Sequence, residues 1–213
     1  MHRTYEILEL FSTPVYTSIL PDNLSSLVPW LYTQEMLEDK IVAPTYGCRS
    51  KNSHILNESQ CSEVNSYILN LTKEFGSQLG FKYREYKFTQ SWISLKHPGQ
   101  QHTAHSHPNS LISGVLFFGS PADNLPSIKF HKYIGSVNTP YIEPHTVADK
   151  RQLKYAQTEF SIDFTPGLIV LFPSYLIHSV PVNNSKVTRY SLAFNIVPQV
   201  GFGSEERLTE LIF

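Results

Sequence analysis

Two histidines separated by one residue, His105 and His107, are the side chains of this sequence that most directly suggest chemistry. They precede an apolar run, and in an extended strand residues i and i+2 point to the same side, so both imidazoles can face one metal ion. A third histidine, His178, lies about seventy residues later and is followed by Arg189 and Ser191. Two close ligands, one distant ligand and an Arg-x-Ser pair form the order that a non-haem iron site requires.

Arg189 suggests a second kind of chemistry, because it lies in the otherwise apolar run TRYSLAFNIV. A guanidinium group is always charged, and burying it unpaired is costly. Its planar donors match a carboxylate bidentately, so a bound dicarboxylate would offset that cost. An internal ion pair, or an edge strand that lets Arg189 reach solvent, is the alternative without a ligand.

The overall charge and composition exclude some classes of function. A net charge of −1 gives no electrostatic reason for nucleic acid or an anionic membrane to be the main partner. No apolar run approaches the roughly 18 residues that span a bilayer, and Glu6 and Glu9 stand where a signal peptide would need an apolar core. Cys48 and Cys61 match no zinc or redox spacing, so we expect free thiols and a cytoplasmic protein.

Helical patterns precede the histidines. Residues 59–81 carry apolar side chains at three- and four-residue steps, with Gly80 as a C-terminal stop. Residues 21–40 have a similar pattern, in which Pro29 restricts where a helix can begin. The sequence therefore predicts helices in the first 83 residues.

From Tyr83 onward the pattern is extended. The chain is rich in aromatic residues (13%) and poor in charged ones (16%), which favours a β-rich protein over a helical bundle. Short runs of β-branched and aromatic residues alternate with Gly, Pro, Asn and Asp, and they predict strands within 86–96, 110–118, 126–134, 158–164, 167–173 and 188–197. This density of strands after a helical start predicts a barrel or sandwich with helices covering one face.

The remaining histidines and the longest irregular stretch have ordinary explanations. We expect His54, His97, His131 and His145 to be structural or exposed rather than ligands. The stretch 134–155 contains several basic residues, and it is either a lid over a pocket or a solvated loop.

Beyond these patterns, the chain resembles the iron(II)/2-oxoglutarate-dependent oxygenase superfamily and, more narrowly, a small 2OG-Fe(II) oxygenase branch of phage and bacterial type. The resemblance runs from FSTPVY through SWISLKHPGQQHTAHSHPNSLISGV to GLIVLFPSYLIHSVPVNNSKVTRYSLAFN. It implies a mainly β fold, the double-stranded β-helix (jelly-roll, cupin-like), with N-terminal helices. We expect a single domain over 1–213, with a helical buttress (1–83), the double-stranded β-helix (84–198) and a C-terminal tail (199–213).

The sequence departs from the superfamily at one metal ligand. The superfamily motif is His-x-Asp/Glu plus a distant His, and here His107 stands in place of the carboxylate. Three interpretations remain open. His105, His107 and His178 bind the metal together; or His105 and His178 bind it, with water or a halide at the position of the carboxylate; or His102 takes part, although its odd offset points it away in a regular strand.

The resemblance also implies roles for residues of the last strand. An Arg about ten residues after the distant His binds the distal carboxylate of 2-oxoglutarate, which fits Arg189, and Ser191 would add a hydroxyl. A Tyr that superfamily members often supply has no counterpart at Leu116 or Phe117, so Ser113 is the candidate substitute. The side chains of Trp92 and Asn195 are expected at the pocket or in the core.

The resemblance implies an Fe(II)- and 2-oxoglutarate-dependent dioxygenase that uses O2, hydroxylates another substrate and releases succinate and CO2. Two alternatives stay open: a three-histidine cupin-type metal dioxygenase that does not use 2-oxoglutarate, and a non-enzymatic β-sandwich binding module. The substrate is expected to be a small molecule or a peptide that the sequence does not identify, with no nucleic acid and no membrane as partner. The sequence is also compatible with a homo-oligomer.

Overall fold

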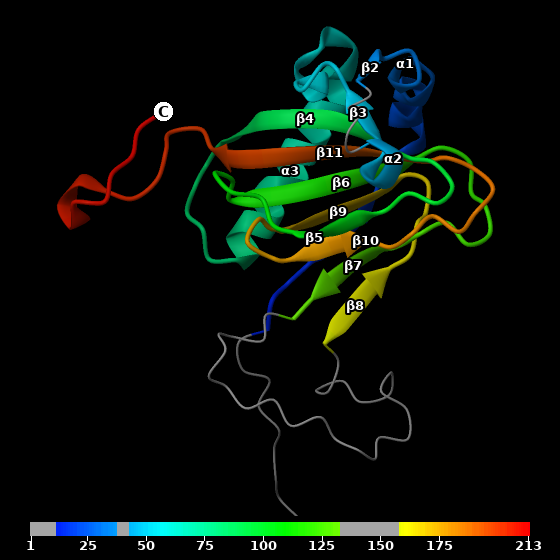
Figure 1. Ribbon diagram of the computed structural model, residues 1–213. Coiled ribbons are helices and arrows are strands. Elements are labelled where there is room, and N and C mark those ends of the chain that lie inside the picture. Colours follow the sequence, from blue (N-terminus) through cyan, green and yellow to red (C-terminus); the bar gives the residue numbers. More distant parts are fainter. Residues whose placement is uncertain (1–11, 38–42, 133–157) are drawn as a thin grey trace, which may run out of the picture.

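Two antiparallel sheets face each other in the computed structural model, which describes residues 12–37, 43–132 and 158–213 (Figure 1). The large sheet has the strand order β1 (Tyr16–Ile19), β9 (Leu168–Pro173), β6 (Ile112–Phe118), β11 (Arg189–Pro198), β4 (Tyr86–Lys96), β3 (Cys48–Ser50) and β2 (Met36–Leu37). The small sheet has the order β5 (His102–His105), β10 (His178–Val180), β7 (Ile128–His131) and β8 (Glu159–Ile162).

Strands β4 to β11 are distributed between the two sheets in the manner of a jelly roll. Strands β4, β6, β9 and β11 lie in the large sheet, and β5, β7, β8 and β10 lie in the small one. Strand β11 is central to the large sheet because it pairs with both β4 and β6. One long strand therefore carries side chains along the whole length of the space between the sheets.

Helices cover the outer face of the large sheet, and α3 lies behind this sheet in Figure 1. The helical segments are η1 (Asp22–Leu27), α1 (Val28–Leu31), α2 (Ala43–Tyr46), η2 (Ile55–Asn57), η3 (Ser59–Cys61), α3 (Ser62–Gln78) and η5 (Glu205–Arg207). None of the helices among the described residues is long and apolar enough to cross a membrane.

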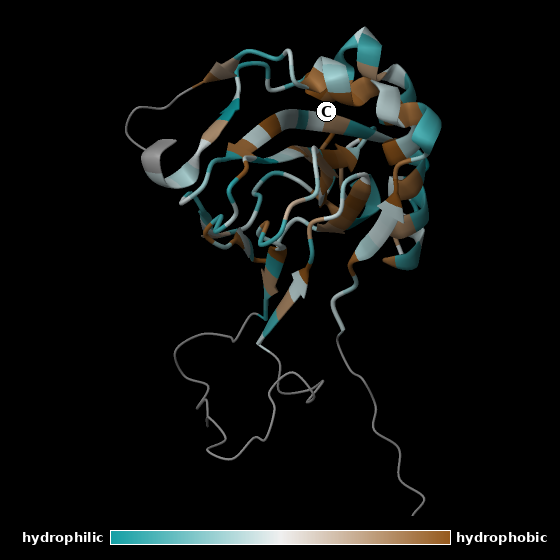
Figure 2. Ribbon diagram, turned by 90° about the vertical axis from the view of Figure 1, so that its right-hand side faces the viewer, coloured by the Kyte–Doolittle hydropathy of each residue, from teal (hydrophilic) through white to brown (hydrophobic). Residues whose placement is uncertain are grey.

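The period-two alternation of strand side chains divides the interior into two cores. On β6, Leu116 and Phe118 belong to the outer core, which the helices cover. Val115 and Phe117 belong to an inner core between the sheets. Figure 2 shows apolar residues concentrated between the helices and the large sheet, while the loops are mostly hydrophilic. The inner core is smaller because polar side chains occupy part of the space between the sheets.

The strongest helical prediction is confirmed by α3, which spans Ser62–Gln78. Gly80 has a φ of +81°, its N–H donates to the carbonyl of Ser77, and the N–H of Phe81 donates to that of Gly76. These two bonds form a Schellman motif, which requires the left-handed backbone that glycine adopts without strain. Both the predicted helix and its predicted stop at Gly80 are therefore observed.

Other parts of the N-terminal region differ from the helical prediction. The pattern within residues 21–40 forms only the short segments η1 and α1, and Met36 lies in a strand instead. Strands β1, β2 and β3 join the large sheet, although no strand was predicted in this region. Each has two to four residues, too few for a period-two pattern to emerge from the sequence.

The mainly β fold is confirmed, and each of the six predicted extended runs contains a strand. The boundaries proposed at residues 83 and 198 stay a prediction. The stretch 134–155, including His145, lies outside the described residues.

Candidate metal centre

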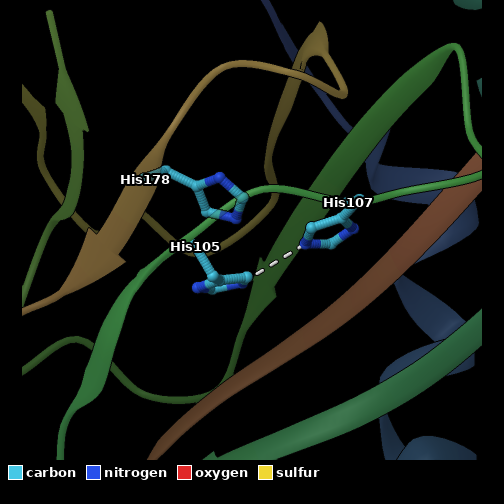
Figure 3. A group of neighbouring side chains, drawn as sticks. All are labelled: His105, His107 and His178. Carbon is cyan, nitrogen blue, oxygen red and sulfur yellow. Dashed lines mark hydrogen bonds between the residues drawn. The ribbon is translucent and has the colours of Figure 1, made fainter. Parts of the chain in front are cut away.

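Three histidines from two distant parts of the chain meet between the sheets (Figure 3). His178 is the first residue of β10 and lies directly opposite His105, the last residue of β5. His107 follows in the loop after β5. One ring nitrogen of each histidine lies within 4.8 Å of those of the other two, an arrangement that could hold a metal ion.

The two neighbouring histidines do not share a regular strand, which corrects the sequence argument for their convergence. Strand β5 ends at His105, and His107 lies beyond it. The backbone N–H of His107 donates to the carbonyl of Ser174 at 2.9 Å, in the turn after β9. This bond, rather than strand alternation, directs the loop so that His107 faces the other two imidazoles.

The Nδ1 atoms of two histidines are held by backbone carbonyls two residues earlier. His105 Nδ1 lies 2.8 Å from the carbonyl oxygen of Thr103, and His178 Nδ1 lies 3.0 Å from that of Leu176. A carbonyl oxygen only accepts, so Nδ1 must carry the hydrogen in both rings. The neutral tautomer then leaves a lone pair on each Nε2, which is the usual arrangement of a metal-binding histidine.

His107 is held by a side chain instead. Its Nδ1 lies 2.5 Å from Oδ1 of Asn195, and the same oxygen accepts a hydrogen bond from the hydroxyl of Ser113 at 2.9 Å. Asn195 and Ser113 are both buried and are register partners on β11 and β6. Because Oδ1 accepts twice, the amide is oriented with its oxygen toward His107, and His107 also keeps its lone pair on Nε2.

Burial keeps the three imidazoles neutral. It lowers the pKa of His178 to about 3, with smaller contributions from the neighbouring histidines. Burial is also the main cause that lowers the pKa of His105 and of His107. The Nε2 atoms of His105 and His107 lie 3.3 Å apart. Since both Nδ1 atoms carry hydrogens, two lone pairs face each other in the neutral rings, and a cation between them would remove that repulsion.

Aromatic rings surround the three histidines. The ring of His178 packs against Phe172 with 4.7 Å between centroids, and Trp92 stacks on His107 at 5.9 Å. His102 stacks on His105 at 4.2 Å but is not a member of the metal-ligating group. The rings therefore restrict the orientation of each imidazole.

Two of the histidines interpreted as structural have partners of their own. His131 contacts Glu159 at 3.3 Å and Ser179 at 2.8 Å. His97 contacts the hydroxyl of Thr188 at 2.8 Å and is exposed. Both lie outside the metal-ligating group.

A pocket of about 540 Å³ opens beside the histidines. Apolar atoms make up most of its surface, and its lining among the described residues contains no carboxylate, lysine or arginine. The lining residues are Thr89, Gln90, Trp92, His102, His105, Ser106, His107, Pro108, Asn109 and Asn195. Trp92 and Asn195 are among the residues of this lining, and a role for them in binding stays a prediction.

Arg189 begins β11, at the end of the strand opposite to Asn195, and is only 2% exposed. Its Nε donates to the carbonyl of Pro126 at 3.0 Å, and its Nη1 donates to the hydroxyl of Ser191 at 3.3 Å. The guanidinium carbon lies 4.9 Å from the ring centre of Phe117 and 5.8 Å from that of Phe164. Burial lowers its pKa to about 10, which leaves it charged at neutral pH.

Ser113 is not near Arg189, so it does not replace the missing tyrosine. It pairs with Asn195, six residues along β11 from Arg189, which corresponds to about 20 Å of strand. Its hydroxyl contacts Ser174 at 2.8 Å as well as Asn195. Ser113 therefore supports the residue that anchors His107.

Lys96 was not among the site residues predicted from the sequence, but it is only 3% exposed and is the register partner of Arg189. The sequence held one sign of this position: Lys96 ends a predicted strand and lies two residues after Ser94 and four after Trp92. Because residues two apart on a strand share one face, Ser94 and Lys96 lie on the same face of β4 as Trp92, which contacts His107.

Residues 90–195 match the model of a family described as "Putative 2OG-Fe(II) oxygenase". Among solved structures, the fold is similar to a Pseudomonas putida prolyl-4-hydroxylase, with a TM-score of 0.56 and 14% identity over 88% of this chain and 95% of that one. HygX from Streptomyces hygroscopicus, solved with nickel, 2-oxoglutarate and hygromycin B, has a TM-score of 0.58 and 9% identity over 89% and 84% of the two chains.

A 2OG-Fe(II) oxygenase-family oxidoreductase from Burkholderia pseudomallei has a TM-score of 0.54 and 12% identity over 85% of this chain and 84% of that one. No curated protein matches the sequence. At these identities the similarities concern the fold, and they confirm the predicted double-stranded β-helix.

Proposed function

We propose a function on the premise that this chain belongs to the 2OG-Fe(II) oxygenase family. Members of the family are enzymes that use Fe(II), 2-oxoglutarate and O2, so the chain is a dioxygenase of this class. Our proposal concerns its residues: His105, His107 and His178 together bind the iron through their Nε2 atoms. The non-enzymatic alternative is thereby set aside.

The observation that carries this assignment is the shared tautomer of the three rings. Each Nδ1 faces an acceptor, so three unprotonated nitrogens point into one space. Two nitrogens bound at right angles at about 2.1 Å from a metal are about 3.0 Å apart, close to the 3.3 Å between the Nε2 atoms of His105 and His107. Imidazole is a good ligand for iron, so the donor set fits this metal.

When bound, the iron supplies the redox chemistry by which O2 and 2-oxoglutarate, which becomes succinate and CO2, hydroxylate a second substrate. The protein contributes geometry, exclusion of water and electrostatics. Three neutral imidazoles leave the charge of the metal uncompensated, which favours anionic co-ligands over water. A 2-oxo acid is such a co-ligand.

Arg189 and Ser191 bind the distal carboxylate of 2-oxoglutarate in this proposal. Arg189 is buried without forming an ion pair within the described part of the chain. The rings of Phe117 and Phe164 keep water from the guanidinium, which strengthens its attraction for an anion. The hydroxyl of Ser191, already in contact with Nη1, supplies a further donor.

The pocket beside the histidines supports an uncharged substrate, because no charged side chain of the described residues lines it. Amide and hydroxyl side chains line it, and its volume suits a small molecule or one or two residues of a peptide. Among proteins of similar fold, HygX was solved with hygromycin B bound, and another is a prolyl-4-hydroxylase. We also propose a cytoplasmic location, which the buried free thiol of Cys61 supports.

The test is metal analysis combined with anaerobic calorimetry of 2-oxoglutarate binding. Iron-loaded wild type should bind 2-oxoglutarate, and Arg189→Met should retain the metal but lose about 2–5 kcal/mol of 2-oxoglutarate binding free energy. His107→Ala should lower metal affinity if His107 is the third ligand. Unchanged metal affinity in this variant would instead support water or a halide at that position.

The same experiment distinguishes the proposed function from that of a three-histidine dioxygenase that does not use 2-oxoglutarate. That enzyme would bind iron with the same three ligands but would show no heat with 2-oxoglutarate, and Arg189→Met would leave its O2 consumption unchanged. Stimulation of O2 consumption and succinate release by 2-oxoglutarate would exclude it.

A further inference from the structure

Lys96 and Arg189 form a pair of buried cations at one end of the space between the sheets. They are directly opposite each other on β4 and β11 and are 3% and 2% exposed. Register partners on antiparallel strands point to the same face of a sheet. Both side chains therefore emerge on the face of the large sheet that meets the small sheet.

Each cation contacts a serine two residues away on its own strand. Lys96 Nζ donates to the hydroxyl of Ser94 at 2.7 Å and to the carbonyl of Leu95 at 3.2 Å, while Arg189 donates to the hydroxyl of Ser191. Ser94 and Ser191 are themselves register partners. We call Lys96, Ser94, Arg189 and Ser191 the cation cluster.

The surrounding backbone fixes the position of Lys96. The side-chain amide of Asn183, in the loop between β10 and β11, donates to the carbonyl of Lys96 at 2.8 Å and to that of Val187 at 2.8 Å. Asn183 is buried, and its own amide oxygen accepts from Ser185. Lys96 is thus held in place rather than extended toward solvent.

The charge of the cation cluster is not compensated by the described protein. Within residues 12–37, 43–132 and 158–213 the ion pairs are Lys51–Glu35, Lys129–Glu159 and His131–Glu159, so neither Lys96 nor Arg189 belongs to one. Burial, followed by the positive charge of Arg189, lowers the pKa of Lys96 to about 8. Two like charges held without water are unfavourable unless an anion lies between them.

We propose that Lys96 is a specificity-determining residue that binds the distal carboxylate of the 2-oxo acid together with Arg189. This inference rests on the proposed function and assigns a role to a residue outside the Arg-x-Ser pair. A carboxylate accepts several hydrogen bonds, so it can take the guanidinium on one side and the ammonium on the other. The cation cluster should therefore select dicarboxylic over monocarboxylic 2-oxo acids.

The test compares two probes that differ in the distal carboxylate, 2-oxoglutarate and 2-oxopentanoate. Their affinities for the nickel-loaded full chain are measured by anaerobic calorimetry in the wild type, in Lys96→Met and in Lys96→Arg. Lys87→Met is the matched control, because Lys87 lies on the same strand but stacks on Phe213 near the C-terminus.

In Lys96→Met we expect the affinity for 2-oxoglutarate to fall about 10- to 100-fold, the usual effect of losing a hydrogen bond to a charged group. The affinity for 2-oxopentanoate should stay within a few-fold of wild type, which also shows that the variant is folded. Lys96→Arg should keep most of the selectivity, and Lys87→Met should keep all of it.

A second readout is the pH dependence of 2-oxoglutarate affinity. The groups that face Lys96 are Arg189 on β11, Cys48 on β3, and His102 and His105 on β5. In the protein without 2-oxoglutarate, Lys96 loses its proton near pH 8. The affinity of the wild type for 2-oxoglutarate should therefore decline above this pH, by up to tenfold per pH unit. Lys96→Arg, which stays protonated, should show a weaker decline.

Two results would overturn the inference. Equal losses for both probes in Lys96→Met, or unchanged selectivity, would show that Lys96 has a structural role only, while the proposed function would stand. A wild-type protein that binds nickel but neither probe would remove the proposed function and this inference together.

Discussion

The two ends of strand β11 differ in how their polar groups are satisfied. At the histidine end, Asn195 and Ser113 anchor His107, and every Nδ1 in the metal-ligating group has an acceptor. At the cation end, Lys96 and Arg189 are charged, buried and outside the ion pairs of the described residues. The histidine end is neutral, with each Nδ1 satisfied and each Nε2 left for a metal, and the other end carries charge that no ion pair of the described residues balances.

In the proposed function, this difference lets one strand serve two parts of a single reaction. The histidine end needs fixed tautomers, which neutral hydrogen bonds supply without competing for the metal. The cation end needs attraction for an anion, which uncompensated charge in a dry environment supplies. Variants at each end test whether one end is neutral and binds the metal while the other carries uncompensated charge.

The largest expected effect concerns His178. His178→Ala should remove metal binding, with a loss greater than the roughly 10–100-fold that outer-shell changes cause, because a direct ligand is lost. Metal content after reconstitution and a metal titration would measure it, with His97→Ala as the exposed control. If His178→Ala binds metal like the wild type, the metal centre assigned to the histidine end is wrong.

The next effect tests the uncompensated charge at the cation end. In the folded, ligand-free protein the pKa of Lys96 is about 8, below its usual 10.5, so the charged form destabilises the fold. The unfolded chain binds more protons between these two pH values, and the contribution of Lys96 to stability therefore rises with pH across this window.

Lys96→Met should consequently be more stable than the wild type at pH 7, by up to about 3 kcal/mol, and the difference should disappear by pH 10.5. Denaturant unfolding of both proteins without metal or 2-oxo acid provides the measurement. A variant that is less stable than the wild type at pH 7 would mean that Lys96 is already compensated.

A smaller effect is expected at the anchor of His107. Asn195→Leu removes the acceptor for Nδ1 and frees the ring to change tautomer, which should lower metal affinity about 10–100-fold. Asn195→Asp keeps an acceptor at the same position and should preserve metal binding. Equal losses in the two variants would indicate that packing, rather than the hydrogen bond, is responsible.

The smallest effect is expected for Ser113→Ala. The change removes one of the two donors to Asn195 Oδ1 and a contact with Ser174, which should cost about 1 kcal/mol of stability. Metal affinity should remain within a few-fold of wild type, since His107 still donates to Asn195. If Ser113→Ala lowers metal affinity as much as Asn195→Leu does, Ser113 is also required to hold His107 in place.

Much of the fold could be predicted from periodicity. Helix α3 and the longer strands carry enough residues for a three- to four-residue or two-residue period to be visible. Strands β1 to β3 have too few residues for such a signal, and pairing with the large sheet decides their conformation. Long elements were therefore predictable, and short ones that depend on neighbours were not.

The order of residues along the chain, together with the family resemblance, indicated His105, His107, His178 and Arg189, because two close histidines, one distant histidine and an Arg-x-Ser pair match the order of a non-haem iron site. Only the tertiary structure decided which nitrogen of each ring is free, since the acceptors at Nδ1 come from local backbone for two histidines and from distant Asn195 for the third. The register of β4 against β11 likewise decided that Lys96 joins Arg189, because hydrogen bonding between strands, and not the order of residues along one strand, sets which side chains meet.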